Sequence, residues 1–528
     1  MKKDTLLFLF ILFIFLALRI YYLDRIFLWN DDLDFIQETF NGDYQWYQSF
    51  YTAIDVSDYI TNPWLPMVVI FSIIGIFGHH ILALKIPSLL VSIGCLYLLK
   101  LILFRLFSNS ISQLLPLIFF SFSIPAIIYS QSFHPTIYFF LSTSFQLYCF
   151  MAIVDRINRQ RGKRSIAGGI YLLAGVCLFS FLLNFMSALI SLILIVWFGL
   201  VVIRKSEAGR WKRGFFVLWN SVLAFLPLGI LILTRLSMGS YRLIYTVNHI
   251  YDVFLYLYDF LFFYLNFAYT PLFYRPLQLN PVSLPFVVLA VGGILYCFLL
   301  YPKQRTPLLI AFGIFLATGI FHVMPLGGIR HSFTLAPFVY IFTGYGIEGL
   351  SRWSAGSNLR KIMFWISLAG YFLFFFGVFF YSGVRIYGDR ESTLKFESIL
   401  KEARKYQVKN IVGLRHTFEA LKIWDATAGY ILAKRGISLQ KYWSGLNQLL
   451  SEKYLLVTYR HSFNPRFDSC VAWRANILDR FDEFSDVKVT ALKETIGPLK
   501  PERDIMVHQS IYYPLNGCFI YLIEPKDN

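Results

Sequence analysis

The stretch Thr5–Leu23 has the sequence TLLFLFILFIFLALRIYYL and lies behind Lys2 and Lys3, from which Asp4 separates it. Its nineteen residues contain Arg19 as their single charge, and about 20 predominantly apolar residues are enough to cross a bilayer as one helix. Such a run behind two lysines is also typical of a signal peptide, but no small-residue cleavage site follows before Asp24. The stretch therefore predicts a retained first transmembrane helix that starts on the cytoplasmic side.

The composition of the whole chain extends this prediction to a membrane protein. Of the 528 residues, 57% are hydrophobic and only 15% are charged, and the mean hydropathy is +0.57. Soluble globular domains have about 25% charged residues, so this chain has too few polar groups to cover a soluble core of its size. The net charge of +17 would indicate nucleic-acid binding in a soluble protein. In a membrane protein, basic residues instead fix the orientation of the helices.

Ten further apolar runs have the length of a transmembrane helix, about 18 to 24 residues. They occupy residues 81–104, 111–129, 136–154, 166–183, 186–203, 214–233, 283–301, 306–324, 332–350 and 362–381. Together with the first helix they give a multi-pass α-helical membrane domain of about eleven crossings over residues 1–381.

Two other apolar stretches, 63–77 and 252–268, fit less well as crossings. The first is short and has prolines at positions 63 and 66, and the second contains Asp252, Asp259 and several tyrosines. We expect both to lie in or dip into the outer interface, where aromatic rings reach headgroup depth. The alternative is that one of them is a short tilted span, which would reverse the sidedness of all later loops.

The basic residues of the membrane domain are divided unevenly between the two sides. Nineteen of its 26 lysines and arginines fall at the N-terminus and in alternate connecting segments, which include the clusters 156–164, 204–213 and 352–361. Short loops rich in lysine and arginine mark the cytoplasmic face. The pattern predicts a cytoplasmic N-terminus, and it places the remaining loops and residues 382–528 outside the cytoplasm. A bacterial inner membrane is the expected location.

Residues 382–528 contain no run long enough to span a membrane and are predicted to form a soluble α/β domain. Strand-like runs occupy residues 410–414, 454–459, 487–492 and 518–523, and helical patterns occupy 392–407 and 417–434. Cys470 and Cys518 could pair if the domain faces an oxidising compartment. No catalytic motif is found here, so the domain is expected either to cap the membrane domain and help select an acceptor or to be purely structural.

Acidic side chains of the membrane domain are concentrated in its first outer loop, residues 24–62. Eight of the 14 aspartates and glutamates lie there. If Asn30 or Asp31 caps a short helix, then Asp31, Asp34 and Glu38 share one helical face. Carboxylates in a first helical turn also favour the helix dipole, and this explanation alone would account for Asp32 or Asp34.

Only a few cations are expected on the outer side of the membrane. Such a residue near the membrane plane needs a lipid headgroup or an anionic ligand, and a lipid-borne phosphate would serve. Arg330 stands out because it follows the pair Gly327-Gly328, which lets the backbone approach a ligand closely. His134 at an outer loop tip has a structural alternative, and His79-His80 lacks a third metal ligand. The outer cations are Arg19, Arg25, Lys85, Arg235, Arg242, Arg275 and Arg330.

The order of these features resembles the C-type membrane glycosyltransferases (GT-C fold), which take sugar from a polyprenyl-phosphate donor. This group includes protein O-mannosyltransferases and lipid A aminoarabinose transferases. The resemblance covers most of residues 1–350 and departs from the family pattern in having Lys85 where the family has Arg, His134 for Arg and His331 for Tyr. Its motifs are Asp31-Asp32, Asn62-Pro63-Trp64-Leu65, Phe77-Gly78, Leu84-Lys85-Ile86-Pro87-Ser88, Ser130-Gln131-Ser132-Phe133-His134-Pro135, and Arg330-His331 with Pro337.

This resemblance implies a hexosyl- or pentosyltransferase in which an acceptor attacks a lipid-phosphate sugar at the outer face, with inversion. Asp31 would then be the general base, and Asp32 would assist it, orient the acceptor or hold a divalent cation such as Mg²⁺ or Mn²⁺. The acceptor, whether lipid, glycan or protein, and any metal requirement stay open. The expected phosphate-binding cations are Arg330, Lys85, Arg242 and Arg275, and secondary candidates for the site are His134, His331 and Asp34.

A transporter or flippase for a lipid-linked glycan is the alternative function. Coupled transporters usually place ionisable residues in mid-membrane, on helices that line the transport path. The predicted spans of this chain are almost free of charge in their middles, and the charges gather at the outer rim. This distribution favours chemistry at the interface over transport.

Overall fold

The structure is a computed structural model. It describes residues 3–22, 64–77, 81–131, 136–159, 163–184, 187–204, 284–300, 333–383, 405–408, 410–413, 438–440, 453–459, 487–494 and 518–525, with isolated helical positions between 219 and 230. The chain divides into two compact units. All of the described helices up to Gly383 belong to the first unit, and the described strands belong to the second.

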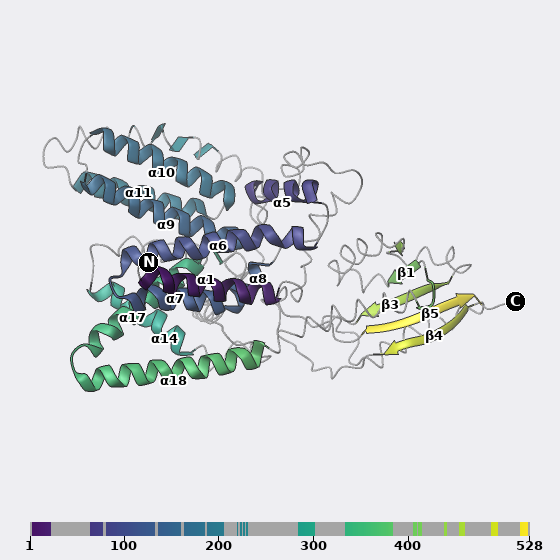
Figure 1. Ribbon diagram of the computed structural model, residues 1–528. Coiled ribbons are helices and arrows are strands. Elements are labelled where there is room, and N and C mark those ends of the chain that lie inside the picture. Colours follow the sequence, from purple (N-terminus) through teal and green to yellow (C-terminus); the bar gives the residue numbers. More distant parts are fainter. Residues whose placement is uncertain are drawn as a thin grey trace, which may run out of the picture. The chain divides into compact units, whose positions relative to one another are not determined.

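The first unit consists of helices whose longer members run alongside one another (Figure 1). Its first helices are α1 (Lys3–Tyr22), α5 (Trp64–Phe77), α6 (Ile81–Leu106), α7 (Ser110–Phe122), α8 (Ile124–Tyr129) and α9 (Thr136–Arg159). They are followed by α10 (Lys163–Leu183), α11 (Ser187–Arg204), α14 (Leu284–Leu300), the 3-10 turn η3 (Phe333–Leu335), α17 (Ala336–Ser354) and α18 (Asn358–Gly383).

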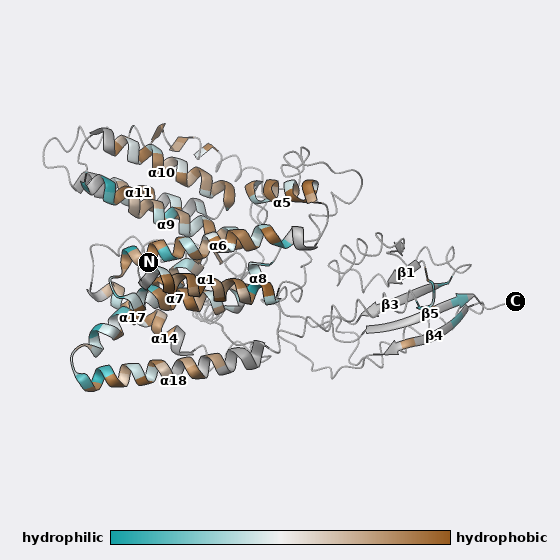
Figure 2. Cartoon of the chain, in the orientation of Figure 1, coloured by the Kyte–Doolittle hydropathy of each residue, from teal (hydrophilic) through white to brown (hydrophobic). Residues whose placement is uncertain are grey.

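These helices make the chain an integral membrane protein. Three of them contain segments long and apolar enough to cross a bilayer, at Lys85–Leu106, Thr136–Arg156 and Ile166–Leu183. Shorter apolar segments occur in α1, α5, α7 and α14. Figure 2 shows apolar residues along most of these helices, whereas the first turns of α18 are hydrophilic. The total of eleven crossings stays a prediction, because the expected spans 214–233 and 306–324 lie wholly or largely outside the described residues.

The expected span 111–129 is wrong as a single helix, because the chain divides there into α7 and α8. Ser123 ends α7 in an extended conformation, with φ −60° and ψ 121°. Pro125 explains the break: it has no N–H to continue the helical ladder, and in an uninterrupted helix its ring would clash with the carbonyl of Ser121 four residues earlier. The helix resumes after one residue, since the amide of Ile127 donates to the carbonyl of Ser123 at 2.9 Å.

Aromatic side chains form the core between α1, α7, α9 and α17. The ring of Phe120 stacks with that of Phe140 at a centroid distance of 4.7 Å and meets Tyr340 edge-on at 5.4 Å. Phe15 of α1 also stacks with Phe120, at a centroid distance of 5.9 Å. All four side chains are buried, and offset or edge-on ring pairs of this kind add about 0.5–1.5 kcal/mol each beyond the burial itself.

Polar side chains join the helices next to this aromatic core. Gln146 of α9 donates to the hydroxyl of Ser191 in α11 at 2.6 Å, and Ser142 donates to the carbonyl of Ser180 in α10 at 3.0 Å. Asn184, after α10, donates to Thr334 of η3 at 2.9 Å. Hydrogen bonds between helices are a usual means of association in a bilayer, where lipid tails compete for apolar contacts.

The second unit contains a five-stranded mixed sheet in the order β2-β1-β3-β5-β4. Its strands are β1 (Asn410–Gly413), β2 (Ser438–Gln440), β3 (Tyr454–Tyr459), β4 (Val487–Glu494) and β5 (Cys518–Pro525). β1 pairs in parallel with β2 and β3, and β5 pairs antiparallel with β3 and β4. Leu522 of β5, which lies between β3 and β4, is buried, and a register shift between Ala491 and Lys493 interrupts β4.

Four of these strands coincide with the runs expected from the sequence, and β2 was not expected. β2 has only three residues, of which Leu439 alone is apolar, so it carries no alternating pattern of its own. The helices expected at 392–407 and 417–434 lie almost entirely outside the described residues, as does Cys470. A disulfide to Cys518 therefore stays a prediction, as do the boundary at residue 382 and the role of this unit.

Candidate functional site

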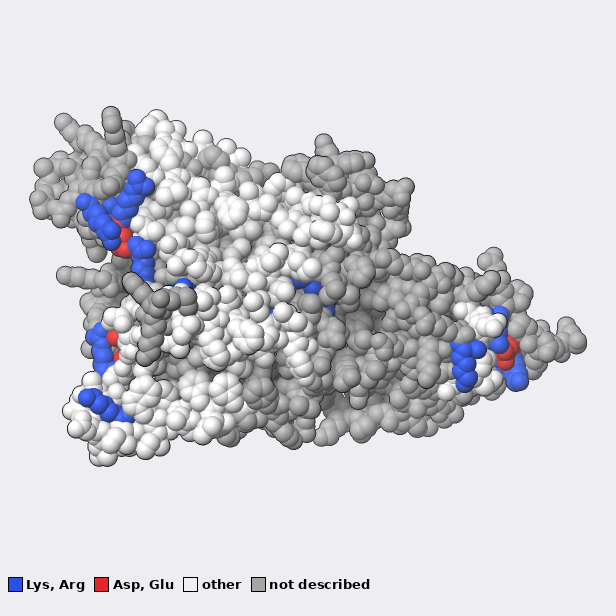
Figure 3. Space-filling model, viewed as in Figure 1, with Lys and Arg blue, Asp and Glu red and all other residues white. Residues whose placement is uncertain are grey.

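Charged side chains of the helical unit gather mainly at one edge, and the broad face beside that edge shows only small patches of Lys or Arg (Figure 3). We call this edge, which includes Arg105, Arg352 and Arg360, the basic end. At the ends of α6 and α9, Arg105 forms an ion pair with Asp155. At the end of α17, Glu348 accepts a hydrogen bond from Ser112 of α7 at 2.9 Å and from Arg352 at 3.1 Å. These contacts join α6 to α9 and α7 to α17 on the side that the charge rule predicts to be cytoplasmic.

Lys85 is the predicted site residue that the structure describes, and it lies far from the basic end. It is in the second turn of α6, while Arg105 is in the last turn. The 20 residue steps between them correspond to about 30 Å of helix, which is about the thickness of the hydrocarbon layer. Lys85 is fully buried within the protein. A cation is costly to bury without compensation, so its retention at this depth calls for anionic or polar neighbours.

Arg19 of α1 is a second fully buried cation, and it also lies at the end of the unit opposite the basic end. Its Nη1 group donates to the carbonyl of Ser121 at 2.9 Å and to that of Phe15 at 3.2 Å. Its guanidinium carbon lies 3.4 Å from the centroid of the Phe15 ring. We expected Arg19 to meet a headgroup or an anionic ligand at the membrane surface. Instead, its described contacts are carbonyl oxygens and aromatic faces inside the protein.

The carbonyl of Ser121 is available to Arg19 because of the break between α7 and α8. In an uninterrupted helix this carbonyl would accept from the amide four residues later, which is that of Pro125. Proline has no N–H, so the acceptor is left over at a buried position, where a missing partner costs about 1–3 kcal/mol. Arg19 supplies the missing donor. In return, Gln131 after α8 donates to the carbonyl of Arg19 itself at 2.8 Å.

The guanidinium of Arg19 is only partly satisfied by these contacts. Its Nε and Nη2 groups have no hydrogen-bond partner among the described residues. None of the described ion pairs includes Arg19. Phe15 and Phe120 lie against the guanidinium, with its central carbon 5.9 Å from the centroid of the Phe120 ring. The arrangement can hold α1 against the α7–α8 break. It leaves the Nε and Nη2 groups of Arg19 as further donors at the same end of the unit as Lys85.

The other predicted site residues lie outside the residues that the structure describes. This applies to both predicted catalytic carboxylates and to three of the four predicted phosphate-binding cations, so their roles stay predictions. Three or more His, Cys, Asp or Glu side chains do not come together within the described ranges, and Asp31 and Asp32 are not in those ranges. The residues concerned are Asp31, Asp32, Asp34, His134, Arg242, Arg275, Arg330 and His331.

The sequence carried a signal for the surroundings of Arg19, although we did not predict them. Ser121 and Pro125 are four residues apart, so the proline marks a carbonyl that loses its helical donor. A buried donor from elsewhere in the chain is then required at that point. Which donor supplies it depends on tertiary contact, since Arg19 and Ser121 are 102 positions apart.

Comparisons with known proteins give two distant structural likenesses. No protein-family model matches the chain, and no curated protein matches it. The crystal structure of ArnT from Cupriavidus metallidurans bound to undecaprenyl phosphate has a TM-score of 0.45 and 11% sequence identity, covering 97% of each chain. The apo structure of the same protein has a TM-score of 0.44 and 12% identity, covering 98% of each chain. ArnT is a lipid A aminoarabinose transferase, a group that the sequence motifs also resemble.

Proposed function

We propose that this integral membrane protein is a glycosyltransferase that takes sugar from a polyprenyl-phosphate donor and transfers it to an acceptor at the non-cytoplasmic face. The acceptor attacks the anomeric carbon, the bond from that carbon to the phosphate oxygen breaks, and polyprenyl phosphate leaves. One direct displacement inverts the anomeric centre. The observation that carries the proposal is the burial of Lys85 about one hydrocarbon thickness away from the basic end of its own helix.

A cation at this depth meets the main electrostatic need of the reaction. The departing polyprenyl phosphate gains negative charge at the membrane boundary, and a preorganised cation stabilises that charge most strongly where water is excluded. Lys85 is fully buried in the second turn of α6. Arg330, after its glycine pair, would complete the phosphate site from a later part of the chain. Arg242 and Arg275 are further candidates for the same role.

The acceptor must lose a proton as it attacks, and Asp31 is the proposed general base. A positioned base of this kind contributes typically about 10²–10⁴-fold to the rate. Asp32 would orient the acceptor, assist Asp31, or hold a divalent cation such as Mg²⁺ or Mn²⁺ together with it. Carboxylate oxygens are suitable ligands for such hard cations.

The positions of charge along the helices support an enzyme over a transporter. Among the described residues of the first unit, the ionisable Lys, Arg, Asp and Glu side chains lie toward helix ends, as with Arg19 in α1 and Glu348 and Arg352 in α17. Coupled transporters usually carry such groups at the middle of path-lining helices. The described spans therefore favour chemistry at one membrane boundary.

Lys85→Ala tests the phosphate site, with Lys100→Ala as the matched control on the same helix. Lys100 places its Nζ atom 3.9 Å from the centroid of the Phe8 ring, well away from the proposed site. We expect Lys85→Ala to weaken binding of undecaprenyl phosphate by more than about tenfold, because a hydrogen bond to a charged group contributes about 1.5–3 kcal/mol. Lys100→Ala should bind as the wild type does. Equal binding by all three proteins would exclude Lys85 from the phosphate site.

Asp31→Asn tests the base separately from donor binding. We expect this variant to fold and to bind undecaprenyl phosphate normally, but to lose transfer from a radiolabelled lipid-linked sugar by about 10²-fold or more. Near-normal turnover would remove Asp31 from the role of base. Normal binding without any turnover in the wild type, over a panel of donors and acceptors, would favour the flippase alternative.

A further inference from the structure

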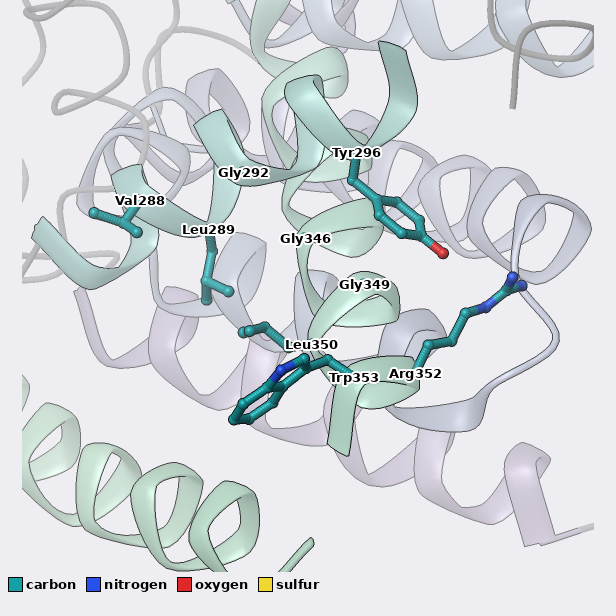
Figure 4. Close-up of a pocket in the computed structure, with 9 residues that line it drawn as sticks. All are labelled: Val288, Leu289, Gly292, Tyr296, Gly346, Gly349, Leu350, Arg352 and Trp353. Carbon is teal, nitrogen blue, oxygen red and sulfur yellow. The ribbon is translucent and has the colours of Figure 1, made fainter. Parts of the chain in front are cut away.

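A pocket of about 860 Å³ lies between α14 and α17, near the basic end of the helical unit (Figure 4). Figure 4 shows Leu289, Leu350 and Trp353 on one side of the glycines at the helix crossing, and Tyr296 and Arg352 on the other. Three residues at its rim, Val288, Leu350 and Trp353, are exposed. The pocket therefore opens outward through an apolar rim, on helices that lie in a membrane. The lining residues are Val288, Leu289, Gly292, Tyr296, Gly346, Gly349, Leu350, Arg352 and Trp353.

The two helices touch at one point of this pocket and leave it open at another. A Cβ atom on Gly293 would come within 1.7 Å of the carbonyl oxygen of Phe342, and one on Gly346 within 2.1 Å of that of Leu289. Backbones this close require glycine. By contrast, a Cβ atom on the neighbouring Gly292 would meet no atom within 4 Å. The pocket therefore has open space beside Gly292, although the two backbones are in close contact at the neighbouring Gly293.

The edge of the pocket carries a surplus of positive charge. Arg352 has a side chain that is 55% exposed, and it is paired with the largely buried Glu348. Arg360, at the start of α18, places its guanidinium carbon 5.2 Å from the centroid of the Trp353 ring. Lys361 follows and is exposed. Three cations against one carboxylate leave this edge attractive to an anionic group.

We infer that this pocket binds an anionic phospholipid of the leaflet on the basic side of the membrane. One acyl chain lies along Val288, Leu289 and Leu350, and the phosphate lies at the level of Arg352 and Arg360. Trp353 and Tyr296 sit at the boundary between the two, where an aromatic ring contacts chain atoms and its polar group stays near the headgroup. An open apolar pocket on a membrane-facing surface cannot stay filled with water, because its wall offers few hydrogen bonds.

Filling the pocket at Gly292 tests the acyl-chain part of this inference. The delipidated full-length protein in detergent is titrated with phosphatidylglycerol, and bound lipid is counted by native mass spectrometry. We expect Gly292→Leu to weaken binding on the order of tenfold, because an excluded chain loses the burial of several methylene groups. The control is Gly370→Leu on α18, where a Cβ atom also meets nothing within 4 Å but which does not line the pocket. It should bind as the wild type does.

Removing charge at the edge tests the headgroup part. We expect the wild type to prefer phosphatidylglycerol over phosphatidylcholine with the same chains, and the double variant Arg360→Gln with Lys361→Gln to lose that preference. Unaltered phosphatidylglycerol binding in Gly292→Leu, or equal binding of both lipids by the wild type, would overturn the inference. Displacement of phosphatidylglycerol by undecaprenyl phosphate in the wild type but not in Gly292→Leu would also overturn it, since the pocket would then belong to the polyprenyl lipid.

Discussion

The two ends of the helical unit hold their cations in opposite ways. At the basic end, Arg105 and Arg352 are partly exposed, and each is paired with a carboxylate of a neighbouring turn or helix. At the other end, Arg19 and Lys85 are fully buried. For Arg19, the described partners are two backbone carbonyls and an aromatic face rather than a carboxylate. The two arginines at the basic end are thus partly exposed to solvent, whereas the two cations at the other end are buried inside the protein.

The contrast indicates what each end does. Exposed ion pairs contribute about 0–1 kcal/mol and are readily replaced, which suits residues whose main effect is orientation of the helices in the bilayer. A buried cation costs several kcal/mol to desolvate, so it persists only where surrounding groups compensate for that cost or where it is used. We therefore expect substitutions at the two ends to differ greatly in effect.

Charge reversal should separate the two ends most sharply. Arg19→Glu would place a carboxylate against the Ser121 carbonyl and the face of Phe15, so we expect about 3–5 kcal/mol of destabilisation. Arg105→Glu, which only opposes the half-exposed Asp155, should cost about 1 kcal/mol or less. The midpoints of thermal aggregation in detergent report the difference. Similar midpoints for the two variants would mean that the ends are not distinct.

Pro125→Ala should have the next largest effect. The alanine would bring back an N–H for the Ser121 carbonyl and compete with Arg19 for it, and a hydrogen bond from a charged donor contributes about 1.5–3 kcal/mol. We expect a lower midpoint of thermal aggregation, together with slower amide exchange over residues 123–127 as α7 and α8 merge. The control is Pro116→Ala, within α7 itself. Unchanged exchange in Pro125→Ala would show that proline does not cause the break.

Glu348→Gln probes the pairing at the basic end. The amide oxygen of glutamine can still accept from Ser112, but its NH2 group then faces Arg352, so the charge and the hydrogen bond from the half-exposed Arg352 are both lost. We expect a decrease of about 0.5–1 kcal/mol that disappears in high salt. Glu348→Leu, which also leaves the buried Ser112 hydroxyl without its acceptor, should cost about 1–3 kcal/mol. If both variants were equally destabilised, the Ser112 contact would have no part in stability.

Arg105→Ala should have the smallest effect of the series. Its partner Asp155 is about half-exposed, so loss of the pair should change stability by about 0.5 kcal/mol or less. The expected consequence lies in orientation instead: fewer cations on this face weaken the charge bias that is predicted to keep it on the cytoplasmic side. Accessibility of an engineered cysteine beside Arg105 to a membrane-impermeant reagent, in intact cells, measures that orientation.

Most helix positions were predictable because lipid imposes a simple rule on sequence. A helix must present about 20 apolar residues to the hydrocarbon layer, and the runs at 81–104, 136–154 and 166–183 stand out in composition alone. The break at Ser123 was missed because the apolar composition of 111–129 continues through it. The short strand β2 was missed because three residues cannot show an alternating pattern.

The candidate site was less predictable than the helices. Lys85 was singled out because a lysine on the outer side is an exception to the charge rule, and its burial is consistent with a specific role. The surroundings of Arg19 could not be derived from local pattern, since they depend on Ser121 from a distant helix. The pocket between α14 and α17 depends likewise on which glycine of a pair faces the neighbouring helix, which composition does not specify.

The bond from Arg19 to Ser121 has a consequence for biogenesis. Its donor is in α1, and its acceptor is 102 residues further along the chain. At about 5–20 residues per second, the ribosome needs roughly 5–20 s to cover that distance. During this interval the guanidinium of the new helix has to remain near water or lipid phosphates, because hydrocarbon offers it no partner. The helix α1 therefore reaches its final depth only after α7 has arrived beside it.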